Sequence, residues 1–415
     1  MLPPLSSVDQ IERVVREEWG RILAIMVKNL GDFQLAEDCM QDALIAAMQH
    51  WEKNGMPRSP AAWLLQVARR RAIDRIRRDQ NFAAKQAELS YLYDLEQTGE
   101  AYEERAVIPD ERLQMIFICC HPILAEKSRI ALTLRALGGL NTEQIAAAFL
   151  DSPEAMQRRI TRAKHAIADA GLAYREPEPS DVPERLHSVL RTLYLIFNEG
   201  YSASSGAELT RVDLSDEAIR LVRIAAQLMP EECEVQGLQA LMLLHDSRRH
   251  ARVGPNGELI TLEHQNRARW SRAKIEEGTK ILQSCLPKGR PGPYQVQAAI
   301  SGVHANSPDW EHTDWAQIVE LYEVLMSMEA TAVVELNHAV ALCLAGQVEK
   351  AQVCLTRLAN SKDMQKYVPF HSARAEVFKR LGQDSDAKAA LQEALALVQN
   401  EAEATFLRSK LAELG

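Results

Sequence analysis

Residues 141–168 read NTEQIAAAFLDSPEAMQRRITRAKHAIA, and this stretch decides how the whole chain is interpreted. Asn141 is a residue type that caps helices, and the short helix it would begin is followed by a tight turn at Leu150. Ser152 then caps a second helix, with Pro153 at its first position. Two short, capped helices around a turn predict a helix-turn-helix, although Leu150 stands where such turns often carry Gly.

The second of these helices separates into two faces when its residues are placed at 100° per residue. Its apolar stripe consists of Met156, Ile160, Ala163 and Ile167. Its opposite face is polar and basic, with side chains suited to base edges and phosphates. The residues of that face expected to contact DNA are Gln157, Arg158, Thr161, Arg162 and His165. An ordinary amphipathic surface helix also has a polar outer face, so this helix alone leaves both interpretations open.

The composition is that of a globular, helix-rich protein. Of 415 residues, 47% are apolar and 25% are charged, which excludes wholesale disorder. Abundant Ala, Leu, Glu, Gln and Arg favour helix. No apolar run approaches the ~20 residues that span a bilayer, and the start of the chain lacks the pattern of a signal peptide. The seven cysteines have no regular spacing and indicate reduced thiols in a cytoplasmic protein.

The net charge of −9 excludes a generally basic surface for nucleic acid, but the charge is unevenly distributed. The acidity lies in the stretch 81–106 and in the C-terminal half. The N-terminal segments are close to neutral, and each contains a local basic cluster. Local clusters matter because electrostatic fields decay over about 10 Å at ordinary salt.

Helical periodicity runs through almost every segment, so we expect an all-α protein. A polar, acidic tether and a proline-rich stretch divide the chain. The expected segments are a helical domain at 1–83, a tether at 84–107, a helix-turn-helix domain at 108–175, a linker at 176–183 and a helical domain at 184–415. Within the first segment, helices are expected at about 7–30, 32–51 and 59–79.

The helix expected at 59–79, SPAAWLLQVARRRAIDRIRRD, is strongly basic in its second half. Six arginines lie between Arg69 and Arg78, and only Asp74 and Asp79 offset them. Six cations along about 15 Å of helix make a good surface for tracking phosphates, although a solvated face that pairs with the acidic tether is the alternative. An acidic patch expected on the surface of the preceding helix consists of Glu37, Asp38, Gln41 and Asp42.

The C-terminal part of the chain contains an internal repeat. LAGQVEKA at 344–351 recurs as RLGQDSDA at 380–387, an offset of 36 residues. A helix, a short Gly turn and a second helix at about 34 residues is the tetratricopeptide period. One departure from helix is expected at 252–261, where Asn256 and Gly257 between short apolar pieces predict a small hairpin.

Nothing in the sequence supports catalysis. GxSxG, HExxH, P-loop and GxGxxG patterns are absent, so we expect no enzymatic activity and no cofactor. Consecutive residues of a helix point about 100° apart, so Cys119, Cys120 and His121 are expected to have a structural role rather than to bind a metal. Polar residues around the expected hairpin are interpreted as buried ion pairs, with a ligand pocket as the alternative. These residues lie at 245–249 and 263–270, together with Tyr294, Gln295, His304, Asp314 and Trp315.

The order of these features resembles the sigma factors of bacterial RNA polymerase, most closely the extracytoplasmic-function group, which keeps only regions 2 and 4. The resemblance runs through AEDCMQDA at 36–43, PAAWLLQVARRRAIDRIRR at 60–78, the polar tether and the helix-turn-helix ending in RRITRAK at 158–164. The remainder is similar to a subgroup with a C-terminal tetratricopeptide-like extension. That similarity includes ERLQMIFICCHPILAEKSRIALTLRALGGL at 111–140, LYLIFNEGYSAS at 193–204 and the late repeats.

The resemblance implies two small helical sigma domains, region 2 and a helix-turn-helix region 4, and a larger tetratricopeptide-like regulatory domain. It implies that the protein contacts the β′ clamp and the β flap of core polymerase. The residues it places at the β′ clamp are Asp38, Gln41 and Asp42. The residues it places at the −10 element are Arg58, Arg69, Arg71, Arg75 and Arg78. At the −35 element, in the major groove, it places the five residues of the helix-turn-helix named above.

The resulting hypothesis is a promoter-specific initiation factor whose partners are core polymerase and promoter DNA, with no membrane partner. An intramolecular contact between the sigma domains and the C-terminal domain would regulate it. Two other classes remain open. A helix-turn-helix regulator with a repeat domain would bind duplex DNA without core polymerase. A helical scaffold with a vestigial N-terminal resemblance would keep its activity when the charges of Arg158 and Arg162 are reversed.

Overall fold

The computed structural model describes residues 7–78, 111–149, 151–172, 182–201, 212–255, 258–398 and 400–414. Over these ranges the protein is all-α, as predicted, and contains no strand; an isolated antiparallel bridge joins Val253 and Leu259. The chain divides into two compact units, Met1–Thr192 and Leu193–Gly415. The acidic tether predicted at 84–107 lies outside the described residues.

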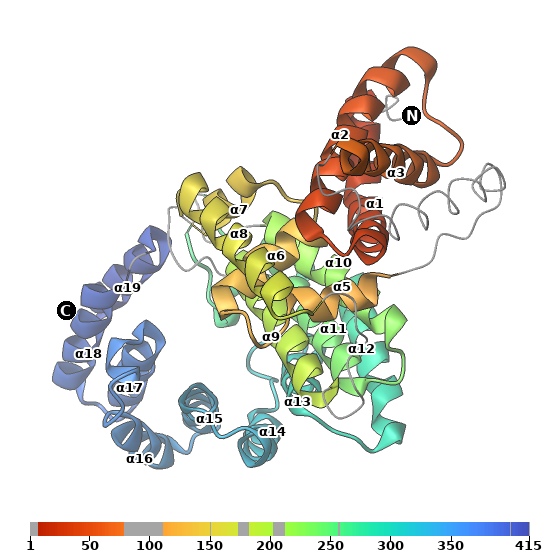
Figure 1. Ribbon diagram of the computed structural model, residues 1–415. Helices are drawn as coiled ribbons and strands as arrows, with labels where there is room; N and C mark the ends of the chain where they lie inside the picture. Colours follow the sequence, from red (N-terminus) through yellow and green to blue (C-terminus); the bar gives the residue numbers. More distant parts are fainter. Residues whose placement is uncertain are drawn as a thin grey trace. The chain divides into compact units, whose positions relative to one another are not determined.

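Within its described residues, the first unit contains two helix bundles (Figure 1). The α1–α3 bundle consists of α1 (Ser7–Leu30), α2 (Phe33–Asn54) and α3 (Pro60–Arg78). The α5–α8 bundle consists of α5 (Arg112–Cys119), α6 (Glu126–Ala136), α7 (Thr142–Ala148) and α8 (Pro153–Asp169). Helix α1 also packs against α5 and α6, so the two bundles form one compact unit.

The ends of α2 and α3 follow from local sequence signals. Gly31 adopts a left-handed φ of 63° between α1 and α2, a conformation that favours glycine. Asp32 caps α2 by accepting a hydrogen bond at 3.0 Å from the backbone N–H of Leu35. Helix α3 begins at Pro60, because the fixed φ of proline suits the first helical position. The helix boundaries predicted for this bundle are therefore confirmed to within a few residues.

Helix α9 (Val182–Tyr201) begins inside the segment 176–183 that the sequence predicted as a linker, and the rest of that segment lies outside the described residues. The division between the two units falls within α9, after Thr192. The first half of the helix packs on the α5–α8 bundle, where the Ser188 hydroxyl donates a hydrogen bond to the Cys120 carbonyl. This packing explains why the first turns of α9 belong to the first unit.

The second unit is an array in which each helix from α10 onward packs against the next one in the chain. Its helices up to the middle of the unit are α10 (Val212–Leu228), α11 (Cys233–Asp246), α12 (Arg272–Cys285) and α13 (Pro293–Asn306). The helices that follow form a curved row in Figure 1 and are α14 (Trp315–Met328), α15 (Ala332–Leu344), α16 (Val348–Leu358), α17 (Val368–Arg380), α18 (Asp384–Leu397) and α19 (Glu401–Glu413).

Short 3-10 helices and one bridge fill the connections of the second unit. The 3-10 helices are η3 (Arg249–Ala251), η4 (Leu262–His264), η5 (Arg267–Arg269), η6 (Leu286–Lys288) and η7 (Met364–Lys366). The hairpin predicted at 252–261 is present as the Val253–Leu259 bridge, supported by a 2.8 Å hydrogen bond from the Ile260 N–H to the Arg252 carbonyl. Its predicted turn residues lie outside the described ranges.

The repeat in the sequence corresponds to two helix pairs, α15–α16 and α17–α18, whose first residues are 36 positions apart. Gly346 and Gly382 adopt left-handed φ angles of 80° and 71° at the two turns. Ala351 and Ala387 occupy equivalent positions and are fully buried, which lets the paired helices approach closely. The predicted order of helix, Gly turn and helix is confirmed for these two pairs.

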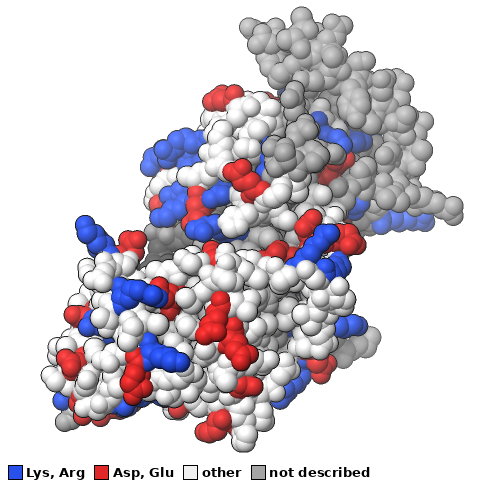
Figure 2. Space-filling model, turned by 90° about the horizontal axis from the view of Figure 1, so that it is seen from below, with Lys and Arg blue, Asp and Glu red and all other residues white. Residues whose placement is uncertain are grey.

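The surface carries charges of both signs. On the face shown in Figure 2, lysine and arginine lie interspersed with aspartate and glutamate. This distribution agrees with a chain whose net charge is −9 and whose basic clusters are local. Within the described ranges, no helix combines the length and the apolar character that crossing a bilayer requires.

Gly20 allows α1 to lie directly against the end of α6. A Cβ built on Gly20 would lie 2.9 Å from the carbonyl oxygen of Leu137, closer than real contacts allow. The obstacle is backbone, which cannot rotate away as a flexible side chain does. We therefore expect Gly20→Ala to lower the free energy of unfolding by about 1–3 kcal/mol.

Gly302, in the interior of α13, provides the matched control. A Cβ added there would meet no atom within 4 Å. Gly302→Ala should therefore raise the stability by about 0.5–1 kcal/mol, because alanine is the better helix former. Thermal unfolding followed by circular dichroism measures both variants. An unchanged or raised stability of Gly20→Ala would contradict the close packing at Gly20.

Candidate functional site

The helix-turn-helix predicted at 141–168 is present as α7 and α8. Asn141 caps α7 through reciprocal hydrogen bonds with Gln144, at 2.7 and 2.8 Å. Ser152 caps α8 by accepting a hydrogen bond from the backbone N–H of Ala155 at 3.1 Å. These local caps determine where each helix begins, so the predicted helix pair is confirmed.

Helix α8 buries one face and exposes the other. The residues of its buried stripe are Met156, Ile160, Ala163 and Ile167, as predicted. Of the residues predicted to contact DNA, Thr161 is half-buried and the exposed ones are Gln157, Arg158, Arg162 and His165. The Arg162 side chain donates a 3.3 Å hydrogen bond to the Arg158 carbonyl. Neither guanidinium forms an ion pair within the described residues, so both charges are available to a phosphate or a base edge.

Helix α3 buries an apolar face and presents arginines to solvent. The buried residues are Leu64, Leu65, Ala68, Ala72, Ile73 and Ile76. Of the residues predicted at the −10 element, the exposed ones are Arg58, Arg71 and Arg78, and the half-buried ones are Arg69 and Arg75. The helix and the loop before it therefore carry the positive surface that the sequence predicts.

Arg75 is paired within the protein. Its guanidinium forms ion pairs with Asp38 at 3.0 Å and with Asp42 at 2.7 Å, both on α2. Burial opposes its charge, but hydrogen bonding and attraction from Asp42 and Asp38 outweigh burial and raise the pKa of Arg75. All three side chains remain more than a third exposed, so the pairs contribute only about 0–1 kcal/mol and can be exchanged for other partners. The structure thus brings Arg75, which was predicted at the −10 element, into contact with Asp38 and Asp42, which were predicted at the β′ clamp.

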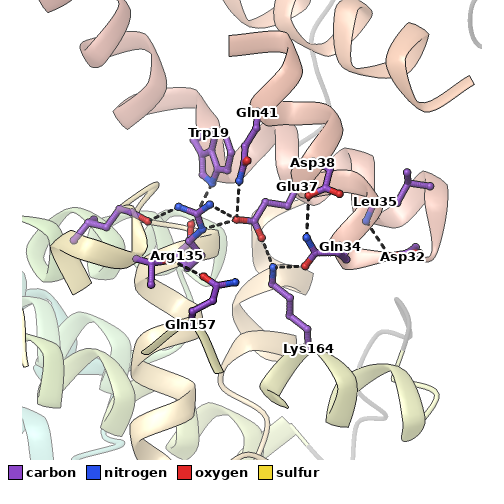
Figure 3. Close-up of polar contacts among 12 residues, drawn as sticks. Trp19, Asp32, Gln34, Leu35, Glu37, Asp38, Gln41, Arg135, Gln157 and Lys164 are labelled. Atoms are coloured by element: carbon purple, nitrogen blue, oxygen red, sulfur yellow. Dashed lines mark hydrogen bonds and ion pairs between the residues drawn. The ribbon is translucent and has the colours of Figure 1, made fainter. Parts of the chain in front are cut away.

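Glu37, also on α2, is buried, with 2% of its surface exposed. This corrects the expectation that it belongs to a solvated acidic patch. Its carboxylate forms ion pairs with Arg135 of α6 and Lys164 of α8 (Figure 3). Gln34 accepts a 3.0 Å hydrogen bond from the Lys164 ammonium, and Gln41 donates to Glu37 at 3.5 Å. One buried carboxylate between two cations therefore joins the α1–α3 bundle to the helix-turn-helix.

Sequence reasoning missed this cluster because the partners of Glu37 lie 98 and 127 residues away in the chain. A run of charges on a helix is ordinarily solvated, and no local pattern marks the carboxylate that turns inward. The usable signal was helix phase. Glu37 lies on the same face as Phe33 and Met40, which are both buried.

Further contacts support the same junction. The indole N–H of Trp19, on α1, donates to the Arg135 carbonyl at 3.2 Å. The Arg135 guanidinium also donates to the Leu140 carbonyl at 3.1 Å. The Lys164 ammonium lies 5.4 Å from the centre of the Phe33 ring, which adds a cation–π contact. Each cation that pairs with Glu37 is thus held by at least one additional partner.

We expect Glu37→Gln to lower the free energy of unfolding by about 3–5 kcal/mol, because it leaves the buried Lys164 and the half-buried Arg135 without their counter-charge. Asp74→Asn is the matched control, since it removes an exposed carboxylate of α3. The control should change the stability by less than about 0.5 kcal/mol. Urea unfolding of both variants makes the comparison, and equal stabilities would contradict a structural role for the Glu37 pairs.

Cys119 and Cys120 are buried, as the structural interpretation predicted. Burial raises the pKa of both thiols, that of Cys120 to about 11. The Cys120 sulfur lies 3.5 Å from the Thr133 hydroxyl. Among the described residues, no group of three or more His, Cys, Asp and Glu side chains is arranged to hold a metal ion.

Comparison with known proteins bears on both units. Residues 14–82 match the sigma-70 region 2 family, and residues 185–286 match a family of unknown function (DUF6596). An uncharacterised protein of Rhizobium meliloti (strain 1021) is 40% identical over 394 residues, which cover 94% of this chain and 93% of that protein. No solved structure matches the chain.

More distant relatives match over a shorter stretch. The ECF RNA polymerase sigma factors SigK of Mycobacterium sp. strains KMS and JLS are each 28% identical over 144 residues, which cover 34% of this chain and 71% of those proteins. The chain belongs, over nearly its whole length, to the family of the Rhizobium meliloti protein, and its residues 14–82 are similar to sigma-70 region 2.

Proposed function

We propose that this protein is a sigma factor of the extracytoplasmic-function group, which binds bacterial RNA polymerase core and directs initiation at specific promoters. The observation that carries the proposal is the combination of a region 2 match at 14–82 with a capped helix-turn-helix whose outer face is basic and exposed. Such a protein is a regulator rather than an enzyme, and it acts in the cytoplasm, where core polymerase and promoter DNA are found.

The proposed contacts divide between the two bundles of the first unit. Helix α8 reads the −35 element in the major groove through the polar face that begins at Gln157 and ends at His165. Helix α3 and the loop before it contact the −10 element through their arginines. Asp38, Gln41 and Asp42 on α2 meet a basic surface of the β′ clamp, and the α5–α8 bundle meets the β flap.

In the structure, the two bundles of the first unit are packed together. On this proposal, that arrangement is a form of the protein that is not bound to a promoter. The −10 and −35 elements lie about 25 base pairs apart, roughly 85 Å along B-form DNA. Helix α8 has 17 residues, so it is only about 26 Å long, and its Lys164 pairs with Glu37 of α2. The recognition helix and the α1–α3 bundle therefore have to separate before both elements are bound, and the Glu37 pairs break when they do.

The second unit is proposed as a tetratricopeptide-like regulatory domain. The support is the pair of helix hairpins with left-handed glycines at their turns, repeated at an interval of 36 residues. Stacked helix hairpins provide extended surfaces for protein partners. An intramolecular contact with the sigma domains is the means by which this domain would control the opening of the first unit.

Run-off transcription with purified core polymerase on a fragmented genomic library tests the proposal. We expect discrete start sites that require both core and this protein. Reversing the charges of Arg158 and Arg162 to Glu should reduce these transcripts at least about 10-fold, because each side chain contributes phosphate or base contacts. Lys350→Glu is the control, since Lys350 is an exposed cation on α16, in the second unit. An absence of core-dependent transcripts from the folded protein would reject the sigma role.

A truncation ending after Thr192 tests the second unit in the same assay. The structure favours this end point over one in the linker, because the first half of α9 packs on the α5–α8 bundle. More transcription from the truncated protein would assign the second unit an inhibitory role, and less would make it a requirement.

A helix-turn-helix regulator that acts without core polymerase is the alternative function. The observation in its favour is that the DNA-facing side of α8 is exposed in the docked unit. Binding to promoter duplex in the absence of core, with an affinity that core does not change, would support this alternative against the sigma factor.

A further inference from the structure

Unpaired positive charge gathers in the second unit, where α11 ends and the connection to α12 begins. Three residues, which we call the arginine cluster, contribute it: Arg248, Arg252 and Arg267. Within the described residues, none of the three forms an ion pair. Their hydrogen bonds go to neutral oxygens of the protein, which leaves their charges uncompensated.

Neighbouring cations, by contrast, are paired. Arg249 forms ion pairs with Asp216 at 2.7 Å and with Asp246 at 2.6 Å. Lys274 also pairs with Asp246. The buried ion pairs that the sequence predicted at this junction are therefore present, but they involve these two cations. Over the part of the chain that the structure describes, Asp216 and Asp246 form their ion pairs with Arg249 and Lys274 and form none with the arginine cluster.

Two members of the arginine cluster surround Tyr201, the last residue of α9. Arg252 is only 9% exposed, donates a hydrogen bond to the Tyr201 carbonyl and lies 3.6 Å from the centre of its ring. Arg248 donates to the Tyr201 hydroxyl at 2.8 Å and lies 6.0 Å from the rings of Tyr201 and Trp270. Burial and the repulsion from Arg248 lower the pKa of Arg252.

The third member, Arg267, is held in the same way. Its guanidinium lies 4.6 Å from the Trp270 ring and donates to the His304 carbonyl at 2.6 Å. Burial lowers the pKa of Arg267, and the attraction from Asp309 and Glu311 does not offset it. Aromatic rings and uncharged oxygens thus position all three guanidinium groups without neutralising them.

The pKa values of two nearby histidines reflect the positive charge of the arginine cluster. Burial, followed by repulsion from Arg248 and Arg252, places the pKa of His245 well below its ordinary value. Burial and repulsion from Arg248 and Arg267 lower the pKa of His304 to about 3. Both imidazoles are therefore neutral at pH 7. They add no charge to the cluster, but each retains nitrogen atoms that can bind a ligand through hydrogen bonds.

Several buried polar atoms at the same place have no hydrogen-bond partner. They are the indole nitrogen of Trp270, Nη2 of Arg267 and Nδ1 of His304. Trp270 is only 4% exposed, so its N–H has little access to solvent. A buried donor left unsatisfied costs about 1–3 kcal/mol, and native structures contain few of them. These atoms lie beside the arginine cluster, where the polar atoms of a bound ligand would pair with them.

We propose that the arginine cluster, together with Trp270 and His304, binds a small ligand through an oxyanion, the phosphate or carboxylate group of a metabolite. An oxyanion supplies both missing elements at once: negative charge for the guanidinium groups and acceptors for the unpartnered donors. Arginine is the residue best suited to this task because its planar fork donates parallel hydrogen bonds to phosphate or carboxylate. The aromatic rings hold the guanidinium planes in place, which reduces the entropy lost on binding.

The proposal concerns the second unit alone and does not depend on the sigma role. Its test uses the full chain and inorganic phosphate or citrate as probes, with chloride at equal ionic strength as one reference. The Arg248→Gln variant in the same salts is the second reference, because phosphate and citrate also stabilise folded proteins by exclusion from their surfaces. We expect one of the two oxyanions to raise the unfolding midpoint by at least about 3 °C when present well above its dissociation constant. A response to phosphate alone assigns a phosphate ligand, and a response to citrate alone assigns a carboxylate ligand.

Two substitutions locate the binding. Arg248→Gln and Arg267→Gln should each weaken the oxyanion at least about 10-fold by isothermal titration calorimetry, because each removes a charged fork. Arg223→Gln is the matched control in the same unit, since Arg223 forms an exposed ion pair with Glu277. The control should bind the oxyanion as the native protein does.

A measurement on the native protein covers the case in which a variant fails to fold. Binding of an oxyanion beside His304 favours its protonated form, so the pKa of His304 should rise from about 3 when the ligand is added. Histidine signals in nuclear magnetic resonance spectra follow this titration. Midpoints equal to those in chloride and an unchanged His304 pKa would overturn the proposal. So would undiminished binding to both Arg248→Gln and Arg267→Gln.

Discussion

The buried carboxylate of Glu37 is the constraint on which the first unit depends. A carboxylate removed from water is stable only when counter-charges and hydrogen bonds replace its hydration, and Arg135 and Lys164 supply them from two other helices. The phase of α2 is thereby set, with Glu37 turned inward. Asp38, the next residue along the helix, faces the solvent side and pairs with Arg75. Adjacent acidic residues of α2 thus have different roles: Glu37 packs inside the unit, and Asp38 forms an ion pair at the surface.

Local signals in the sequence predicted the helices well. Asn141 and Ser152 both cap helices where they were expected to, because a cap depends on the next three residues only. The docking of the two bundles was not predictable in this way. Glu37 and Lys164 are 127 residues apart, and only tertiary structure distinguishes a buried carboxylate from the solvated ones beside it.

In the second unit, too, the sequence predicted local structure but not the contacts between distant residues. Its repeated hairpins were predictable because glycine recurs where a left-handed φ is needed, at Gly346 and Gly382. The polar residues near the hairpin at 252–261 were interpreted as buried ion pairs, yet the sequence could not show which of them pair with each other. Arg248 and Arg249 are adjacent and chemically identical, but one donates to a tyrosine hydroxyl and the other pairs with two aspartates. Partner choice depends on which carboxylates the fold brings within reach.

If α3 contacts DNA as proposed, the pairing of Arg75 with Asp38 and Asp42 has a consequence for the salt dependence and the selectivity of that binding. An arginine that meets a phosphate usually releases a mobile ion from the DNA atmosphere into the solution, and the salt dependence of affinity counts such releases. Arg75 instead already has two counterions, the carboxylates of Asp38 and Asp42, which belong to the protein itself. When it turns to a phosphate, two carboxylates are left exposed near the polyanion, and they repel it. The proposed complex of α3 with DNA is thus expected to require a well-aligned phosphate, because only such a phosphate displaces both aspartates.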